Sequence, residues 1–385
     1  MIEFALQKDF LRIFMRFFLF VLSCFALEFE EVGHRASTMG GVGVAMKNNP
    51  YAIFYNPALA SANDNARMGY ALSAAFGEKN LLDVFNFDLN NIQDISKFNK
   101  LLDDNLLRTK AQGAWALKAP SNLIFGDLSI GFMINVYTAS TFTGRLANDI
   151  TAINDNIDFK IRRLDTVELP VAYSFALDTA LGELSWGAAL KFMSFSNVEL
   201  SRKLGVTDSK SSIQKEIKSI MDGSNSVSAY NYGIDLGFAY SPAILPEFSL
   251  GLSGRNLNRP KFNFKEQGKI TAFPQARLGL AYELGEGLLL GMDADLTRNI
   301  MLSPSATKKQ YSQKIGIGVD AHTPFFSARA GLASDIAQKN GLIMSFGLGF
   351  GLVDIGVSAS TKKGKVDDVS YPRYFSLHLG GSYEF

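Results

Sequence analysis

The sequence predicts an all-β fold, a transmembrane antiparallel β-barrel of about fourteen strands with helical outer loops. Three observations predict it: an export signal at the N-terminus, segments of about ten residues in which apolar side chains alternate, and connections that alternate in length. Lipid offers no hydrogen bonds to the backbone, so a chain that crosses a membrane without helices must pair every strand edge by closing into a ring.

The N-terminus has the layout of a secretory signal. Met15-Arg16 precedes the apolar run FFLFVLSCFAL, which is too short to span a membrane, and the acidic stretch EFEE follows it. Cys24 and Ala26 at the −3 and −1 positions predict a signal peptide over residues 1–26. The residues VLSC around Cys24 loosely resemble a lipoprotein box, so lipidation is an alternative to simple cleavage, which we favour.

Composition narrows the class of protein. The 385 residues are 47% hydrophobic and carry a formal net charge of +1, which argues against a disordered tail and against an electrostatic nucleic-acid binder. Cys24 is the only cysteine, so the cleaved chain has no thiol, whether translation starts at Met1 or at Met15. Disulfides, CxxC redox chemistry and cysteine–metal sites are thereby excluded, and we expect no metal and no cofactor.

Period-two alternation begins at Ala66 and recurs to the end of the chain, so residues 66–385 are predicted to form the barrel. In the last segment, Phe375, Leu377 and Leu379 share one face and polar residues share the other. The predicted strands are 66–76, 109–118, 126–138, 165–178, 184–197, 228–241, 247–256, 274–284, 286–297, 312–322, 325–335, 341–351, 353–361 and 371–385.

The predicted connections alternate in length. Those that follow the odd-numbered strands are mostly long (77–108, 139–164, 198–227 and 257–273), while the others are tight turns. A barrel with both termini in the periplasm needs this asymmetry, because periplasmic turns are short and outer loops are long. We therefore assign the long loops to the cell exterior and the chain to the outer membrane of a Gram-negative cell.

A large soluble β-sandwich or β-solenoid would also alternate. The continuous apolar face and the export signal argue against these folds. The chain also ends in Phe385, with Tyr383 two residues earlier, which resembles the recognition signal of the outer-membrane assembly machinery.

The face opposite the apolar one is rich in glycine, alanine and serine, with scattered charges of both signs. These charges are Arg67, Lys191, Asp235, Arg277, Glu283, Asp293, Asp295, Lys314, Asp320, Arg329, Asp335 and Asp354. Opposite charges on neighbouring strands more often pair across the strands or anchor a segment in the lumen than line an ion path. We favour pairing and anchoring here, so the charges predict no ion selectivity.

Two outer loops are predicted to be helical. In the loop 80–107, apolar residues recur at spacings near three and four, which indicates one or two amphipathic helices. Their apolar face would either capture a hydrophobic ligand or pack as a lid onto the barrel mouth. The segment 208–222 predicts a second, short helix with a solvated face.

Residues 33–60 precede the first strand and carry the most specific motif. Its elements are Met39, Gly40, Gly41, Ala45, Ala52 and the run Tyr55, Asn56, Pro57, Ala58, Leu59 and Ala60. The arrangement resembles that of the TraF-type conjugal transfer proteins, outer-membrane barrels within the long-chain fatty-acid transporter (FadL-like) superfamily. The stretch MDADLTRN at 292–299 is also similar, so the resemblance covers nearly the whole chain after the signal.

In the fatty-acid transporters the segment with this motif is a plug inside the barrel. The resemblance implies the same for residues 28–62, in an N-terminal plug segment 27–65. Glycines such as Gly40 and Gly41 permit close backbone approach in a crowded lumen, and Asn56-Pro57 forms a turn whose polar groups need local partners. An ordinary periplasmic segment is the alternative, and a phosphate cradle is discarded because no Lys-Ser/Thr pair follows the glycines.

Two functions stay open. The first is a passive channel for hydrophobic or amphipathic small molecules, and the second is a non-transporting platform for a conjugation, secretion or surface apparatus. An enzyme is not expected, because His34, His322 and His378 lie in three different contexts. The expected partners are membrane lipid, the outer-membrane assembly machinery and a hydrophobic small-molecule ligand, and nucleic acid is not expected.

Overall fold

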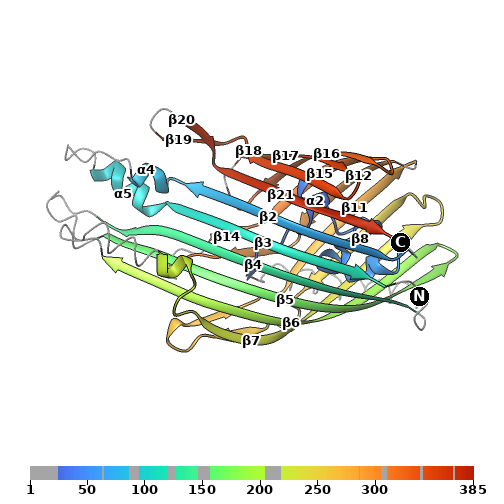
Figure 1. The fold of residues 1–385 in the computed structure, drawn as a ribbon, viewed down its shortest axis with the longest axis horizontal. Helices are drawn as coiled ribbons and strands as arrows, with labels where there is room; N and C mark the ends of the chain where they lie inside the picture. The colour runs from blue at the N-terminus through green and yellow to red at the C-terminus, as the bar shows by residue number, and fades with distance from the viewer. Residues whose placement is uncertain are drawn as a thin grey trace, which may run out of the picture.

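The chain folds into one closed antiparallel barrel, seen from the side in the computed structural model (Figure 1). The structure describes residues 25–62, 65–85, 95–119, 126–145, 157–203, 218–285, 287–304, 310–338, 341–366 and 369–385. The fourteen barrel strands are β2 (Arg67–Lys79), β3 (Leu106–Lys118), β4 (Asp127–Gly144), β5 (Ile157–Thr179), β6 (Gly182–Lys203), β7 (Val227–Pro242), β8 (Phe248–Arg255), β11 (Gln275–Leu284), β12 (Leu288–Asp295), β15 (Lys314–His322), β16 (Phe326–Asp335), β17 (Leu342–Phe350), β18 (Val353–Ser360) and β21 (Tyr374–Glu384). The predicted fold class and strand number are confirmed.

The strand order is the simplest that closes a ring. Each barrel strand pairs with the barrel strands before and after it in the sequence, and β21 pairs with β2 to complete the circle. In the described part of the chain, no helix is long and apolar enough to cross a membrane.

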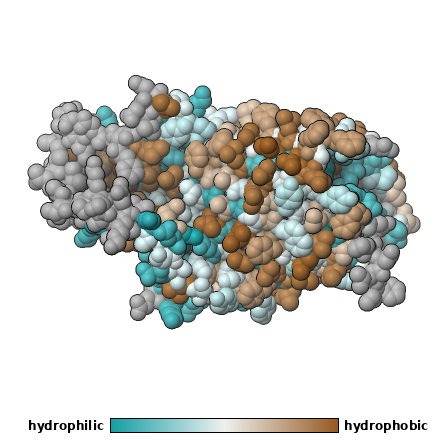
Figure 2. Space-filling view, viewed as in Figure 1, coloured by the Kyte–Doolittle hydropathy of each residue, from teal (hydrophilic) through white to brown (hydrophobic). Residues whose placement is uncertain are grey.

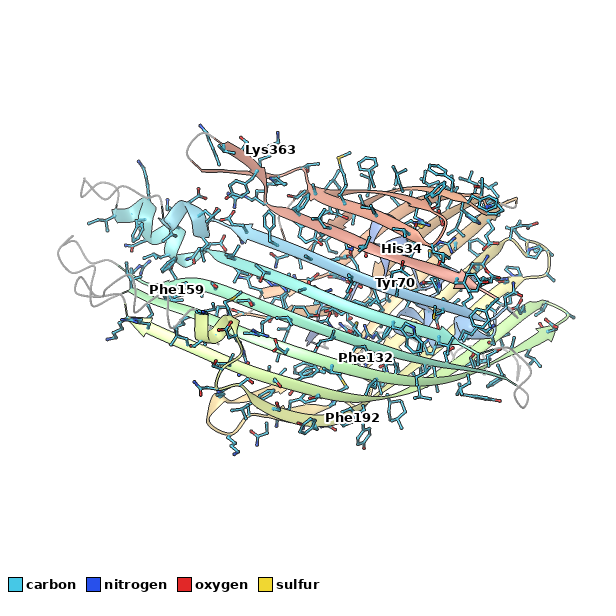
Figure 3. The ribbon with its side chains drawn as sticks, viewed as in Figure 1. His34, Tyr70, Phe132, Phe159, Phe192 and Lys363 are labelled. Carbon is cyan, nitrogen blue, oxygen red and sulfur yellow. The ribbon has the colours of Figure 1, made fainter. Side chains whose placement is uncertain are left out.

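The outward face of the barrel is apolar and the inward face is polar. Leu169, Val171 and Tyr173 on β5 are each at least 40% exposed, while Thr166 and Glu168 on the same strand are buried. Figure 2 shows apolar side chains spread over the barrel wall that faces the viewer, and Figure 3 labels Phe132 and Phe192 on that wall. Aromatic and aliphatic side chains in this position suit contact with lipid.

The wall is taller on one side than on the other. β5 has 23 residues and β6 has 22, whereas β12 has 8 and β15 has 9. A tilted strand crosses a bilayer with about 9–11 residues. The strands β4 to β6 therefore extend beyond the apolar belt, at the end that carries the long connections.

The helices of the loop 80–107 cover this extension from the outside. α4 (Leu81–Phe85) and α5 (Ile95–Asp103) confirm the predicted helices, and their apolar residues pack against Phe142 and Ile157, with Phe159 beside them. Phe142 has the same strand parity as the exposed Phe132, so the helices lie on the outward face of the wall. The apolar residues of the two described helices cover strand residues on the outward face and not the barrel mouth, while residues 86–94 of the predicted ligand-capturing face or lid lie outside the described part of the chain.

The loop between β6 and β7 does the same over a shorter stretch. Residues 218–221 are helical, and Ile220 packs on the outward-facing Ile161 and Val198. Most of the predicted helix 208–222 lies outside the described residues.

Among the described residues, three small sheets lie outside the barrel ladder. β9 (Lys261–Asn263) and β10 (Lys269–Thr271) form a hairpin around the 3-10 helix η4 (Lys265–Gln267), and β19 (Lys363–Val366) pairs with β20 (Val369–Pro372). β1 (Phe25–Leu27) runs parallel to β13 (Arg298–Met301), which pairs with β14 (Gln310–Ser312). Residues 1–24 of the predicted signal peptide, with Cys24, lie outside the described part of the chain.

Residues 28–61, called here the inner segment, lie inside the barrel. They contain α2 (His34–Thr38), α3 (Ala52–Tyr55) and the 3-10 helix η1 (Pro57–Ala60), and most of their residues are buried. α2 contacts β16, β17, β18 and β21, while η1 contacts β4, β5, β6 and β7 across the lumen. The inner segment therefore fills the barrel from one wall to the other.

Candidate functional site: the filled lumen

The Met39–Ala45 stretch of the predicted motif runs along the inner wall. Gly40 has φ 71°, and a Cβ atom there would lie 2.6 Å from the carbonyl oxygen of Leu332 on β16. Gly41 has φ 86°, and Ala45 accepts a hydrogen bond from the Ser249 hydroxyl of β8 at 2.7 Å. Glycine is needed at both positions for its positive φ, and at Gly40 also for close contact with the strand backbone.

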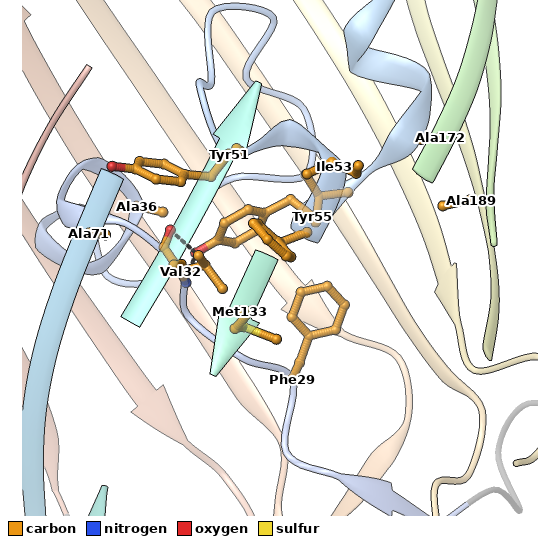
Figure 4. Packing of buried hydrophobic residues seen from close by; sticks show 14 residues of the cluster. Phe29, Val32, Ala36, Tyr51, Ile53, Tyr55, Ala71, Met133, Ala172 and Ala189 are labelled. Carbon is orange, nitrogen blue, oxygen red and sulfur yellow. Dashed lines mark hydrogen bonds between the residues drawn. The ribbon is translucent and has the colours of Figure 1, made fainter. Parts of the chain in front are cut away.

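The Asn56-Pro57 turn of the motif fixes the other end of the inner segment. The Asn56 side-chain amide donates to the carbonyl oxygens of Val44 and Phe238, both at 2.9 Å, and its oxygen accepts from the backbone N–H of Ala58 at 3.1 Å. One side chain thus caps η1, ties two parts of the inner segment together and reaches β7. Tyr55 turns back into the same segment, where its hydroxyl bonds both backbone groups of Val32 (Figure 4).

A buried ion pair and a buried histidine–carboxylate contact hold α2 against the wall. Arg35 Nε lies 2.6 Å from Asp320 Oδ2 on β15, and His34 Nε2 lies 3.2 Å from Asp354 Oδ2 on β18. Arg329 of β16 bonds both of these carboxylates, so the two anchors form one network. Because each charge has a partner at short range, the cost of burial is offset.

The predicted pairing and anchoring by inward charges is confirmed. Arg277 pairs with Asp295 on the neighbouring strand at 2.6 Å, and Lys191 pairs with Asp235 at 3.1 Å. Asp293 anchors the inner segment, because its carboxylate accepts the backbone N–H groups of Gly43 at 2.9 Å and Val44 at 3.1 Å.

The acidic stretch at the start of the inner segment forms three ion pairs with the wall. Glu28 pairs with Arg108 at 3.0 Å, Glu31 pairs with Lys314 at 2.8 Å, and Glu30 pairs with Lys110. Burial alone would raise the pKa of Glu28, but Arg108, Lys314 and Lys110 outweigh it and hold that pKa at about 2. Against the same effect of burial, the pKa of Glu31 is also lowered, chiefly by Lys314, so Glu28 and Glu31 are ionised at neutral pH.

A cavity of about 110 Å³ lies over these ion pairs, at the lumen end that carries the long connections. Its lining combines the three ion pairs with aromatic and aliphatic residues, among them Phe29, Leu106, Tyr137, Ile343 and Tyr374. His378, predicted on the lumen face, is buried and contributes to the lining. The cavity is amphipathic, since charged pairs and apolar side chains share its surface.

The β9–β10 hairpin packs inside this end of the lumen against β6 and β7. Its Phe262 and Phe264 are fully buried, and the ring of Phe262 stacks on Phe195 of β6 with centroids 3.9 Å apart. Asn197 and Asn231 hold the hairpin from β6 and β7 through hydrogen bonds of 3.1 Å and 2.9 Å.

The ladder between β4 and β5 is interrupted at one level. Pairing stops after Ile130 and Val171 and resumes at Met133 and Glu168, so Gly131 and Phe132 face Pro170 and Leu169 outside the ladder. Proline has no N–H to donate, which accounts for part of the break. Ile53 and Phe54 of α3 lie directly behind it, because a Cβ on Gly131 would meet their side chains at 3.2 Å and 2.8 Å.

The residues predicted as sites fall into two groups. The motif residues Met39, Gly40, Gly41, Ala45, Tyr55, Asn56, Pro57 and Ala58 are brought together in the inner segment, whereas Tyr383 and Phe385 are exposed and stacked at the end of β21. The three ion pairs that Glu28, Glu30 and Glu31 form with the barrel wall were not predicted. The sequence signal for these pairs is the acidic stretch EFEE, which from the sequence alone resembles the flank of an export signal.

These features define a closed antiparallel β-barrel of the membrane-spanning class, whose lumen holds its own N-terminal segment. A family model described as the F plasmid transfer operon protein TraF matches residues 53–295. The chain belongs to this TraF family, which confirms the resemblance to the TraF-type proteins. No curated protein sequence matches the chain.

Three solved structures share the fold. The deltaS2 mutant of TodX, a monoaromatic hydrocarbon channel, matches with TM-score 0.57 at 12% identity over 93% of this chain and 99% of that chain. A Pseudomonas aeruginosa FadL homologue gives TM-score 0.55 at 12% identity over 94% and 99%. The Ralstonia pickettii toluene transporter TbuX gives 0.53 at 14% over 93% and 99%.

Proposed function

We propose that this chain is a passive channel of the cell outer membrane for amphipathic small molecules, with the inner segment as its plug. The observation that carries the proposal is the amphipathic cavity above the ion pairs of Glu28, Glu30 and Glu31. It has space for a ligand and lies at the lumen end with the long connections, which we assign to the cell exterior. Residues 1–26 act as the export signal, and Tyr383 and Phe385 serve recognition by the assembly machinery.

The chemistry of the cavity favours an amphipathic ligand over a plain hydrocarbon. TodX is described as a monoaromatic hydrocarbon channel and TbuX as a toluene transporter. A hydrocarbon would displace water from the buried ion pairs without forming hydrogen bonds to them, which is unfavourable. A ligand with one polar end and one apolar end satisfies both parts of the lining.

The exit is proposed at the interrupted ladder between β4 and β5. The axial path is filled by the inner segment, whereas Gly131 and Pro170 are not paired with each other in the β4–β5 ladder, and Ile53 and Phe54 lie behind Gly131. Retraction of α3 would open a lateral path from lumen to lipid at this level.

Two disulfide locks test this route in proteoliposomes, in a chain without Cys24. Phe132→Cys with Leu169→Cys closes the interrupted rung, and Ile130→Cys with Val171→Cys closes the regularly paired rung next to it. All four side chains face outward with similar exposure, from 39% to 46%. Uptake of radiolabelled oleate is the readout.

We expect the first lock to reduce uptake until a reductant is added, and the second to leave uptake unchanged. Equal effects of both locks would remove the lateral route, and absence of uptake in the unlocked protein would remove the channel proposal itself.

The alternative is a partner platform without transport. The family description, a protein of a plasmid transfer operon, favours this role. Mild crosslinking in cells that also express the transfer apparatus would then recover the barrel with a partner, and recovery of the barrel alone would contradict it.

A further inference from the structure

The seam between β2 and β21 differs from every other junction in the barrel. Its strands are the first and the last of the ring, so no hairpin turn sets their register, and the paired residues are about 300 positions apart. Elsewhere in the ring, neighbouring strands follow one another in the chain, and the connection limits their register. The seam therefore needs another source of register information.

Tyr51 of the inner segment contacts both seam strands at one rung. Its hydroxyl donates to the carbonyl oxygen of Tyr70 on β2 at 2.6 Å and lies 3.2 Å from that of Gly381 on β21. Tyr70 and Gly381 are register partners, so a single hydrogen is shared by the two sides of the seam. Tyr51 is fully buried, and its hydroxyl points toward the strand of Ala71 in Figure 4.

A second rung of the seam is held in the same way. Arg67 and Glu384 are register partners and form an ion pair at 3.2 Å. Arg67 also donates to the Lys47 carbonyl oxygen at 3.1 Å and to Asn48 Oδ1 at 2.9 Å. The inner segment thus contacts the seam at two rungs that are three residues apart on β2.

His34 extends the contact to the next strand. Its Nδ1 lies 3.3 Å from the Tyr51 hydroxyl, and its Nε2 lies 3.2 Å from Asp354 on β18, which pairs with β21. A Cβ on Gly380 would come within 2.6 Å of His34 Nδ1, so β21 can lie this close to the His34 imidazole only with glycine at position 380.

We propose that the inner segment is an internal template for barrel closure: through Tyr51, and through Lys47 and Asn48 acting on Arg67, it sets the register of β2 against β21. A one-residue slip at the seam would turn the apolar face inward. A two-residue slip would keep the faces but move Gly381 away from Tyr51 and Glu384 away from Arg67. The template therefore opposes the slip that hydrophobic patterning alone tolerates.

Tyr51→Phe and Tyr55→Phe form a matched pair for the test. Each removes one hydroxyl from a fully buried tyrosine of the inner segment, but the Tyr55 hydroxyl bonds only Val32 of the same segment in the described structure. Each full-length variant is refolded from urea into detergent micelles. The folded barrel is followed by its faster migration on unheated gels, and hydrogen exchange is measured in the product.

We expect Tyr51→Phe to slow closure several-fold and to raise hydrogen exchange in β2 and β21 only. Tyr55→Phe should close at nearly the wild-type rate, without faster exchange at the seam. Equal rates for both variants, or an exchange increase spread evenly around the ring, would overturn the proposal.

Register is read directly with cysteine pairs. Met68→Cys with Tyr383→Cys reports the native rung, and Met68→Cys with Phe385→Cys reports a two-residue slip. The slipped crosslink should increase in the Tyr51→Phe background and not in the Tyr55→Phe background. If Tyr51→Phe does not fold, Asn48→Ala supplies a milder loss at the other rung, and an unchanged slipped fraction there would count against the template.

Discussion

The guanidinium of Arg277 lies 4.0 Å from the centroid of the Phe29 ring. Arg255 lies near the same ring at 5.2 Å, so Phe29 is placed between cations from β8 and β11. Both arginines have carboxylate partners in the wall, which leaves their faces free to contact an aromatic ring. Phe29 therefore anchors the start of the inner segment by apolar burial and by cation–π contact together.

Phe29→Ala should cost about 3–5 kcal/mol of unfolding free energy, as expected for loss of a buried aromatic side chain. Phe29→Leu keeps much of the apolar contact and loses the cation–π part, so it should cost about 2 kcal/mol. Urea unfolding in micelles, followed by the fluorescence of Trp115 and Trp186, measures both. Phe132→Leu on the lipid face is the control, and equal losses at 29 and 132 would contradict the anchor.

The barrel strands could be predicted because lipid imposes a simple rule on them. Alternate residues of β21, such as Leu377 and Leu379, face lipid and are 49% and 42% exposed. Ser376 on the opposite, inward face of the same strand is buried. This alternation applies to each strand separately, so a strand can be predicted from its own residues without knowing which strands lie beside it. The position of α4 and α5 was missed because it depends on how far β4 and β5 rise above the lipid.

The glycines of the inner segment allow a ranking of two substitutions. At Gly40 a Cβ would lie 2.6 Å and 2.9 Å from backbone oxygens, which cannot move aside, whereas at Gly41 the nearest atoms belong to the Glu31 side chain at 3.3 Å. Gly41→Ala should cost about 1–2 kcal/mol for its positive φ alone, and Gly40→Ala should cost more. Urea midpoints of the two variants measure the order, and the reverse order would show that backbone contact at Gly40 is not limiting.

Two substitutions of Asn56 separate the loss of a hydrogen-bond donor from the introduction of a negative charge. Asn56→Ala removes the η1 cap and the bonds to Val44 and Phe238, which should cost about 1–3 kcal/mol. Asn56→Asp keeps the cap but places a carboxylate oxygen against two carbonyl oxygens in a buried site, so it should cost more than alanine. Greater stability of the aspartate variant in urea unfolding would mean that the cap outweighs the amide donors.

The contacts of the inner segment could be predicted only in part. Glycines and an Asn-Pro turn are local signals, so the motif around Gly40 and Asn56 was readable as a crowded, tightly turned segment. The partners of Glu28 and Tyr51 lie on β3, β2 and β21, between about 20 and 330 residues away in the chain. No local sequence pattern indicates contacts between residues so far apart in the chain, because these contacts form only when the barrel closes around the inner segment.

His34 should give the protein an acid-sensitive range of stability. Burial lowers the pKa of this imidazole from 6.5 to about 4, and it outweighs the opposing effect of Asp354. Between these two pH values the unfolded state takes up a proton and the folded state does not, so the free energy of unfolding falls as the pH drops from 6.5 to 4. Above 6.5 the imidazole is neutral in both states and adds no slope.

The His34→Gln variant isolates this effect in urea unfolding measured across the same pH range. Loss of the bonds to Asp354 and Tyr51 should lower its stability at neutral pH, while its slope below pH 6.5 should be flatter than that of the wild type. Glu28 loses its own stabilising contribution between pH 4.5 and about 2, so it overlaps only the lowest part of this range. The slope between pH 6.5 and about 5 is therefore the part to compare. An equally steep slope in the variant would assign the acid sensitivity to a different group, since His34 is then absent from the titration.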